Sequence, residues 1–196
     1  ITAKQTTPLP FAVEVGHIVP APLAHEQMAE IEQLVIAALS ALGVTDTVTH
    51  TEVKLTPHGP RIIEVNARPG GDKIPRLVQA VTGYDLRVVA LYLALGKTLA
   101  DVPRSASETP VAAIRFLAAE QAGIIDLAEP TDALAVHGIQ MVELFVPTGS
   151  EVERTTSNYT RLGYVMVHAR DAHEANELAD EAIRRLAVQI ELPVKP

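Results

Sequence analysis

The side chains of this chain that could do chemistry concentrate between His50 and Gly71. Two runs of alternating apolar and polar residues flank Pro57-His58-Gly59, and this pattern predicts a β-hairpin with strands at about 48–56 and 60–66. Because successive side chains of a strand point to opposite faces, three residues of each run share a face. They are His50, Glu52 and Lys54 in the first run, and Ile62, Glu64 and Asn66 in the second.

Whether these two faces coincide depends on the register of the hairpin. A three-residue loop at 57–59, with its glycine in the left-handed conformation, pairs Thr56 with Pro60 and places Glu52 opposite Glu64. A four-residue loop shifts the register by one residue and puts the two carboxylates on opposite faces. We choose the first register because two facing carboxylates, which repel each other, can then hold a cation between them.

The donor types in the hairpin suit a metal and a phosphate. Carboxylate and amide oxygens are ligands for Mg²⁺, which keeps few protein ligands and takes phosphate oxygens for the rest. Glu52, Glu64 and Asn66 supply such a set, and Arg68 can hold a phosphoryl or carboxylate oxygen by a two-pronged contact. The turn Pro69-Gly70-Gly71 can direct backbone N–H groups at the same anion. The alternative is a solvated hairpin face with a loop behind it.

The same residues carry a family resemblance. The sequence His50-Thr-Glu-Val-Lys, a short turn and then Glu64-Val-Asn-Ala-Arg-Pro-Gly-Gly-Asp resemble the magnesium-binding hairpin of ATP-grasp enzymes. The similarity is greatest to carboxylate–amine ligases such as the bacterial L-amino-acid ligases, and phosphoribosylglycinamide synthetases are more distant relatives. The resemblance implies an ATP-dependent ligase that joins a carboxylate, an amino acid by preference, to an amine through an acyl phosphate.

The resemblance also implies residue roles. Mg²⁺ or Mn²⁺ would be held by Glu52, Glu64 and Asn66. Arg68 would steady the acyl phosphate or the substrate carboxylate, and the amides of Gly70-Gly71 would bind the substrate and polarise its carbonyl. Lys54 is a weaker candidate for contact with the phosphates of ATP, because a lysine on a strand is commonly just solvated.

A second stretch of similarity lies upstream, at residues 10–20, Pro-Phe-Ala-Val-Glu-Val-Gly-His-Ile-Val-Pro. It resembles the strand before a long helix in the amino-acid ligases, where an acid and a histidine three residues later border the amino-acid pocket. These positions are Glu14 and His17. A carboxylate can bind a substrate ammonium, and an imidazole can donate to a developing oxyanion. The alternative is a strand with one exposed acid and a histidine at a turn.

Part of such an enzyme is missing from this sequence. ATP-grasp enzymes hold ATP between two α+β lobes, and the lobe with the flexible phosphate loop precedes the region of similarity. The chain begins at Ile1 and has no Gly-rich phosphate loop of the Walker or dinucleotide type. We therefore expect the C-terminal half of a ligase, inactive alone, with the N-terminal lobe as its partner in a longer chain or a split enzyme. The alternatives are a fragment of a purine-pathway ATP-grasp ligase and a non-catalytic binding or assembly module.

Composition limits the partners. Sixteen Lys and Arg against 24 Asp and Glu give a net charge of −8, which argues against binding nucleic acid or anionic membranes through bulk electrostatics. The expected partners are small-molecule carboxylate and amine substrates, and a homodimer stays open. The chain has no Cys, so it has no disulfide or thiolate chemistry, which suits the cytoplasm. No signal peptide and no uncharged apolar run of about 18–20 residues is found.

Apolar periodicity predicts helices on both sides of the hairpin. Residues 22–42 form a long amphipathic pattern, and a shorter apolar pattern ends at Gly83. Asp85 is the expected cap of a third helix that ends at Gly96. A strand at 11–18 precedes all of these elements and would carry the upstream acid and histidine.

The predicted fold class is α+β. Residues 1–102 are expected to form the C-terminal lobe of an ATP-grasp fold, an antiparallel sheet with helices behind it. Residues 103–110 are the predicted linker to a small α+β subdomain at 111–196. This subdomain resembles that of the amino-acid ligases, chiefly through Arg161-Leu-Gly-Tyr-Val. Its expected elements are strands at 111–117, 137–146 and 161–169 and a helix capped by Asp171. The polar loop at 147–159 is expected to be a surface loop, and the alternative is that it folds over the active site.

Overall fold

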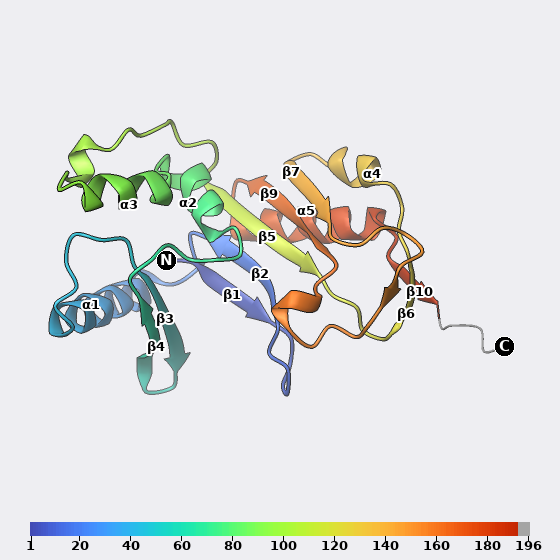
Figure 1. Ribbon diagram of the computed structural model, residues 1–196, viewed down its shortest axis with the longest axis horizontal. Helices are drawn as coiled ribbons and strands as arrows, with labels where there is room; N and C mark the ends of the chain where they lie inside the picture. The colour runs from blue at the N-terminus through green and yellow to red at the C-terminus, as the bar shows by residue number, and fades with distance from the viewer. Residues whose placement is uncertain (192–196) are drawn as a thin grey trace. The chain divides into compact units, whose positions relative to one another are not determined.

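The computed structural model describes residues 1–191, and its elements form two compact units (Figure 1). The first unit comprises Ile1 and Ala21–Glu108. The second comprises Thr2–Pro20 and the described chain from Thr109 onward. Each unit has its own sheet and its own buried apolar residues, so each is described by itself.

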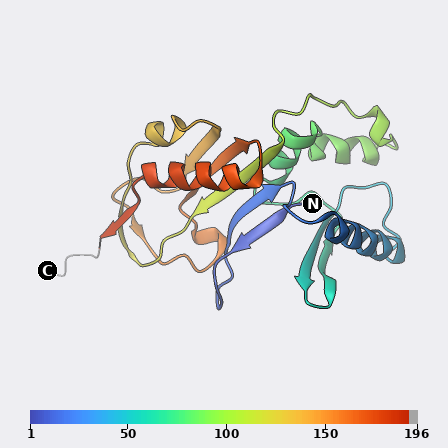
Figure 2. The same ribbon diagram turned by 180° about the vertical axis from the view of Figure 1, so that it is seen from behind.

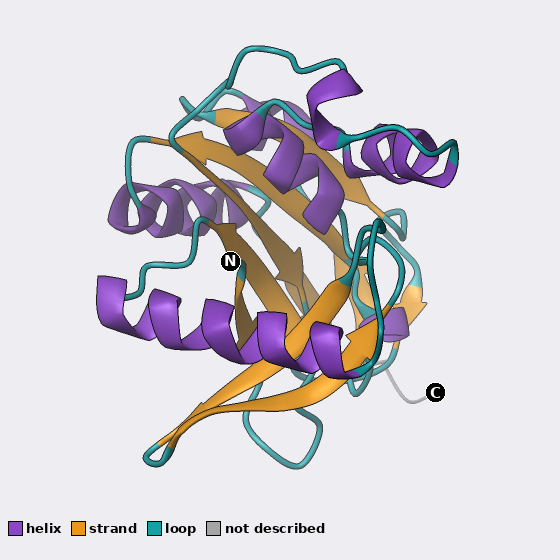
Figure 3. Ribbon diagram, turned by 90° about the vertical axis from the view of Figure 1, so that its left-hand side faces the viewer, coloured by secondary structure: helices purple, strands orange, loops and turns teal. Residues whose placement is uncertain are grey.

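The first unit is built from a hairpin and helices. Its elements are α1 (His25–Ala41), β3 (His50–Thr56), β4 (Gly59–Asn66), α2 (Ile74–Thr82), α3 (Leu86–Ala94) and the short 3-10 helix η1 (Leu99–Asp101). Helix α1 packs against β4 and crosses the hairpin obliquely (Figure 3). A second contact region gathers the buried residues Val48, Val89 and Val102, and α2 buries one apolar face. The hairpin is thus supported on one side and leaves polar residues exposed on its strands.

The helix ends in the first unit follow local chemistry. Gly83 ends α2 with φ of 79° and donates its N–H to the carbonyl of Gln79, a conformation that favours glycine. Asp85 caps α3 by accepting from the backbone N–H of Arg87 at 2.9 Å. The side-chain hydrogen bond from Arg87 also lowers the pKa of the Asp85 carboxyl below its ordinary value. Both predicted helix boundaries are therefore confirmed.

None of the helices in the described chain, residues 1–191, is both long and apolar enough to cross a membrane alone. Helices α2 and α3 meet the criteria of length and composition only as a pair, which is bent by 91°.

The second unit contains a five-stranded antiparallel sheet. Its strands, in spatial order, are β1 (Ala3–Thr6), β2 (Glu14–Val19), β5 (Val111–Leu117), β9 (Gly163–Ala169) and β7 (Ile139–Leu144). Helix α5 (Ala172–Arg185) covers one face of this sheet, as Figure 2 shows from behind. Nearly all of β9 is buried, since it lies between two strands and under the helix. The sheet holds β2 in a fixed register against β5.

Smaller elements complete the second unit. They are a three-stranded sheet of β10 (Gln189–Glu191), β6 (Gly123–Asp126) and β8 (Glu151–Val152), the helix α4 (Pro130–Leu134) and the 3-10 helix η2 (Asn158–Thr160). The sequence did not predict β1, the three-stranded sheet or α4. All are short, and short elements have little periodicity from which to be recognised.

The α+β class is confirmed, and the main predicted elements are present with ends shifted by a few residues. The sheet pairing differs from the predicted division in one respect. Strand β2 pairs with β5, so residues 2–20 belong to the second unit and not with the hairpin. The predicted linker runs back along the first unit, because Ser105 donates its N–H to the Gly83 carbonyl and Glu108 donates its N–H to the Ala80 carbonyl.

Candidate functional site

The hairpin turn is tighter than predicted. Thr56 pairs with Gly59, so the loop contains only Pro57 and His58, and the predicted pairing of Thr56 with Pro60 is wrong. The Thr56 hydroxyl donates to the Gly59 carbonyl at 2.8 Å and accepts from the His58 N–H at 3.1 Å. Gly59 has φ of 87°, as its place in the turn requires.

A β-bulge then restores the predicted pairing of the acids. Val53 pairs with Ile62, whereas the next pair is Glu52 with Glu64, so Ile63 is an extra residue on β4. The facing position of Glu52 and Glu64 is therefore confirmed, although the turn alone would not have produced it. Ile62 faces Val53, so its predicted place on the face of Glu64 is wrong. Two adjacent isoleucines interrupt the alternation of β4, and this was the available signal of a bulge.

A second pair of like charges lies next to the acids. Lys54 pairs directly with Arg61, and strand alternation puts Lys54 on the same face as Glu52, about 7 Å further along. Both cations are exposed. Arg61 was not predicted on this face, because the two-residue turn, in place of the predicted three-residue loop, puts it opposite Lys54. One hairpin face thus presents two acids and then two cations.

His50 lies next to Glu52 on the same face of β3. Its Nε2 is 3.3 Å from Glu52 Oε1, and the residue pairs across the hairpin with Asn66. Asn66 Nδ2 is buried and, among residues 1–191, has no hydrogen-bond partner. Glu64 is exposed and makes no side-chain hydrogen bond or ion pair with any described residue. Two facing carboxylates and one amide, with Glu64 uncommitted, fit a hard divalent cation.

The Gly-Gly turn follows the hairpin and leads into α2. A Cβ added at Gly70 would lie 2.9 Å from His50 Nδ1, whereas one added at Gly71 would meet nothing within 4 Å. The Gly71 carbonyl accepts from the Ile74 N–H at 2.9 Å, which closes the first turn of α2. Arg68 is exposed, and its Nη1 donates to the Pro69 carbonyl at 3.0 Å. Gly70 therefore packs closely behind His50, while Gly71 and Arg68 are accessible.

In the second unit, Glu14 and His17 lie together on β2. His17 Nε2 is 3.5 Å from Glu14 Oε2, and the histidine side chain is fully buried. Lys4 of β1 binds the other carboxylate oxygen, with Nζ 2.6 Å from Oε1. The alternative of an exposed acid with a histidine at a turn is wrong, because His17 is a buried strand residue. Lys4 was not predicted, since β1 was not predicted.

Two further residues contact Glu14 through its main chain. The Glu14 N–H donates to Asn158 Oδ1 at 3.0 Å, and Arg161 Nη1 donates to the Glu14 carbonyl at 3.2 Å. Asn158 belongs to the segment predicted to be a surface loop. Arg161 opens the Arg-Leu-Gly-Tyr-Val sequence that carried part of the resemblance, although no functional role was assigned to it.

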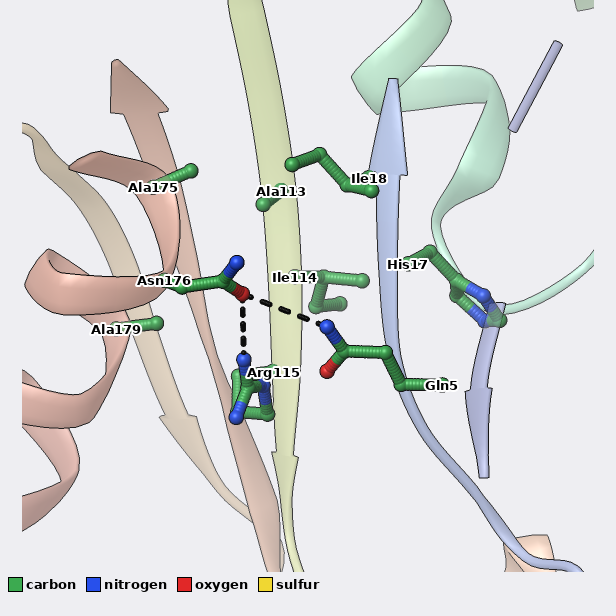
Figure 4. Close-up of a pocket in the computed structure, with 9 residues that line it drawn as sticks. All are labelled: Gln5, His17, Ile18, Ala113, Ile114, Arg115, Ala175, Asn176 and Ala179. Atoms are coloured by element: carbon green, nitrogen blue, oxygen red, sulfur yellow. Dashed lines mark hydrogen bonds between the residues drawn. The ribbon is translucent and has the colours of Figure 1, made fainter. Parts of the chain in front are cut away.

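A small pocket lies between β5 and α5 in the second unit (Figure 4). Arg115 Nη2 donates to Asn176 Oδ1 at 2.8 Å, and Gln5 Nε2 reaches the same oxygen at 3.4 Å. Arg115 Nη1 also lies 3.1 Å from Asp180 Oδ1. Because these polar groups bind one another, they tie β1 and β5 to α5, and we assign them a structural role.

Two family models match the chain. Residues 1–76 match the ATP-grasp domain, and residues 115–191 match the L-amino acid ligase C-terminal domain 2. The first match contains the hairpin and the two candidate residues of β2, Glu14 and His17. The second contains Asn158 and Arg161.

Relatives and solved structures agree with these matches. The chain is 33% identical over 178 residues to the uncharacterized protein y4rH of Sinorhizobium fredii (strain NBRC 101917 / NGR234), which covers 90% of this chain and 36% of that protein. It is 32% identical over 114 residues to carnosine synthase 1 of Gallus gallus, which covers 58% of this chain and 12% of that protein. The crystal structure of L-amino acid ligase from Bacillus licheniformis has a TM-score of 0.77 at 21% identity, covering 96% of this chain and 48% of that chain.

The structural similarity confirms the predicted ATP-grasp fold. The chain spans about a third of the length of y4rH and about half of the solved ligase.

Proposed function

Because the chain belongs to the ATP-grasp family of ligases, with L-amino acid ligases among its relatives, we propose that it is the metal- and substrate-binding part of an ATP-dependent enzyme joining an amino acid to an amine. The rest of the ligase, including the lobe that completes the nucleotide site, would be supplied by further sequence or by another chain. Without it we expect this part to be inactive. We also expect the enzyme to work in the cytoplasm.

The observation that carries this proposal is the paired charges of the hairpin face. Glu52 opposite Glu64 and Lys54 opposite Arg61 are two like-charged pairs, and each should destabilise the hairpin by itself. A cation bound by the acids and an anion bound by the basic pair relieve both repulsions at once. A metal–nucleotide complex presents a cation next to an anion and so matches both pairs. A solvated surface without a ligand would keep both repulsions.

Glu52, Glu64 and Asn66 would hold Mg²⁺ or Mn²⁺, which supplies positive charge that offsets the charge of ATP phosphates when bound. Lys54 and Arg61 would bind phosphate oxygens. Arg68, exposed and planar, would bind the substrate carboxylate and then the acyl phosphate by two parallel hydrogen bonds.

The reaction balances without a protein nucleophile. A carboxylate oxygen of the amino acid bonds to the γ-phosphorus of ATP while the bond to ADP breaks. The amine nitrogen then bonds to the carbonyl carbon, phosphate leaves and the amine loses one proton. Gly71 is exposed, and its N–H would stabilise the negative carbonyl oxygen of the second step, as other backbone donors do in acyl transfer.

Glu14 would bind the ammonium group of the amino acid. Its carboxylate already binds Lys4 through Oε1 and approaches His17 through Oε2. A carboxylate has acceptor sites for more than two donors, so it can bind a substrate ammonium in addition. The shape of the substrate pocket would select the amino acid and the amine. Side chains other than Glu14 and His17 would also form that pocket.

The test is phosphate release from ATP with a panel of amino acids and amines, using the protein expressed from its native gene. We expect release that requires both an amino acid and Mg²⁺. Release coupled to the formation of phosphoribosylglycinamide would assign the purine-pathway activity instead. No release with any pair, together with Mg²⁺-independent nucleotide binding, would favour a non-catalytic module.

A further inference from the structure

The segment 157–161, just before β9, hydrogen-bonds to the main chain of Glu14 on the side where no strand pairs with it. Strand β2 pairs with β5 only from Gly16 onward, so the sheet leaves the main chain of Glu14 without a neighbour on that side. The N–H of Glu14 is satisfied instead by Asn158 Oδ1 at 3.0 Å, and its carbonyl by Arg161 Nη1 at 3.2 Å. Two side chains from one short segment therefore hold both main-chain polar groups of Glu14.

Arg161 also connects this contact to His17. Its Nε donates to the Asn158 carbonyl at 2.7 Å, and its guanidinium carbon lies 3.8 Å from the centre of the Phe116 ring. Phe116 contacts the His17 ring edge to face, with centroids 5.9 Å apart. Arg161 is only 8% exposed, so these contacts keep its geometry fixed. One buried cation thus supports the backbone of Glu14 and the aromatic ring against His17.

The segment is itself preorganised by hydroxyl groups. Thr160 Oγ1 accepts from the N–H groups of Thr156 at 3.1 Å and Ser157 at 3.3 Å. Thr155 is buried, accepts from the Ala119 N–H at 2.8 Å and donates to the Thr160 carbonyl at 3.0 Å. Tyr159 lies in the same segment but is 99% exposed. Asn158 is therefore held by a fixed turn, and its exposed neighbour takes no part in the contact.

We propose that Asn158 and Arg161 are positioning residues of the amino-acid site, fixing Glu14 and His17 so that their side chains meet the substrate in one geometry. This inference rests on the proposed function, in which Glu14 binds the substrate ammonium. Neither residue needs to touch substrate, since both act through the main chain of Glu14 and the ring of Phe116. The segment 157–161, predicted to be mainly surface loop, would thereby help to determine which amino acid binds.

The test compares three variants of the protein expressed from its native gene. Asn158→Ala removes the acceptor, Asn158→Asp keeps an oxygen at the same place, and Tyr159→Ala changes an exposed side chain of the same segment. We expect Asn158→Ala to raise KM for the amino acid about tenfold, because the loss of one hydrogen bond to Glu14 would leave its carboxylate less well positioned. The values of kcat and of KM for ATP should stay within about twofold of the wild type. Asn158→Asp should restore most of the affinity, and Tyr159→Ala should match the wild type.

Hydrogen exchange at the Glu14 amide reports the contact directly. We expect faster exchange in Asn158→Ala than in Tyr159→Ala, with the same melting temperature in both. Unchanged KM in an active Asn158→Ala variant would overturn the inference while leaving the proposed function in place. A wild-type protein that turns over no amino acid would instead overturn the proposed function, and the positioning role with it.

Discussion

Glu52 and Glu64 face each other across the hairpin because Ile63 is an extra residue that shifts the register between the turn and the acids. On the turn side of this bulge, the two-residue turn places Lys54 opposite Arg61. A bulge bends and twists its strand locally, and it commonly re-aims side chains at functional sites. The hairpin therefore separates a pair of acids from a pair of basic residues within a few positions.

The like-charged acid pair predicts effects of opposite sign on stability and activity. Replacing Glu64 by Gln removes the repulsion with Glu52, so in EDTA the free energy of unfolding should rise by about 0.2–1 kcal/mol. The same change should abolish ligase activity and the stabilisation by Mg²⁺, because it would remove one of the proposed metal ligands. Thermal unfolding with EDTA and with Mg²⁺ measures the two effects on stability, and phosphate release from ATP measures the activity.

The matched control for this variant is Glu30→Gln, which changes an exposed acid on α1. It should leave both the activity and the response to Mg²⁺ unchanged. Activity near the wild-type level in Glu64→Gln would contradict the metal assignment, and unchanged stability in EDTA would contradict the repulsion.

Arg68 should matter for turnover more than for nucleotide binding. Arg68→Ala removes a planar donor that would hold the carboxylate and the acyl phosphate, so kcat should fall by about 100-fold while the Kd for ATP changes by less than about threefold. Arg68→Lys keeps the charge but loses the two-pronged geometry, so it should recover only part of kcat. Pre-steady-state phosphate release and nucleotide titration separate the two quantities. Equal losses in both would argue against a role at the acyl phosphate.

The features that could be predicted from the sequence are those set by residues close together in the chain. The hairpin residues lie close together in the sequence, so alternation and turn chemistry were enough to place Glu52 and Glu64 on one face. The helix that begins after Asp85 was predicted for the same reason, because a cap and an apolar pattern are adjacent signals. The facing position of the acids was right, although the bulge at Ile63 was not foreseen.

The rest depends on contacts between distant parts of the chain. Strand β2 joins β5 in the second unit, and no local pattern specifies which sheet a strand joins. The contacts of Glu14 follow from that pairing, since Asn158 and Arg161 reach it only because β9 lies next to β5. Lys4 was missed because β1 has four residues, too few for a clear alternation.

The cap of α3 predicts a pH dependence of stability. Asp85→Ala removes the acceptor for the Arg87 N–H and the ion pair with its guanidinium, so the free energy of unfolding at pH 7 should fall by about 1 kcal/mol. Hydrogen bonding to Arg87 lowers the pKa of Asp85 in the folded protein. Its stabilisation is therefore fully present above the unfolded pKa of about 3.9 and is lost as pH falls through the lower folded pKa.

Denaturant unfolding of the wild type and Asp85→Ala between pH 7 and pH 2.5 measures this dependence. The difference between the two proteins should be constant down to about pH 4 and shrink below it. A difference that persists undiminished at the lowest pH would mean that the charge of Asp85 contributes nothing to the cap.

Gly70 and Gly71 should respond differently to the same substitution. A Cβ at Gly70 would lie 2.9 Å from His50 Nδ1, so Gly70→Ala must displace the ring that contacts Glu52. Groups that orient a metal ligand commonly change metal affinity by 10- to 100-fold, and we expect about a tenfold weaker Kd for Mn²⁺ in this variant. Gly71→Ala keeps its N–H and meets nothing within 4 Å, so its Kd should equal that of the wild type.

Titration of Mn²⁺ followed by electron paramagnetic resonance measures the affinity of each variant without relying on catalysis. The comparison is controlled internally, since the two changes are chemically identical and adjacent. The same Kd in both variants would mean that His50 does not orient Glu52. A loss only in Gly71→Ala would mean that the accessible glycine, and not the packed one, shapes the site.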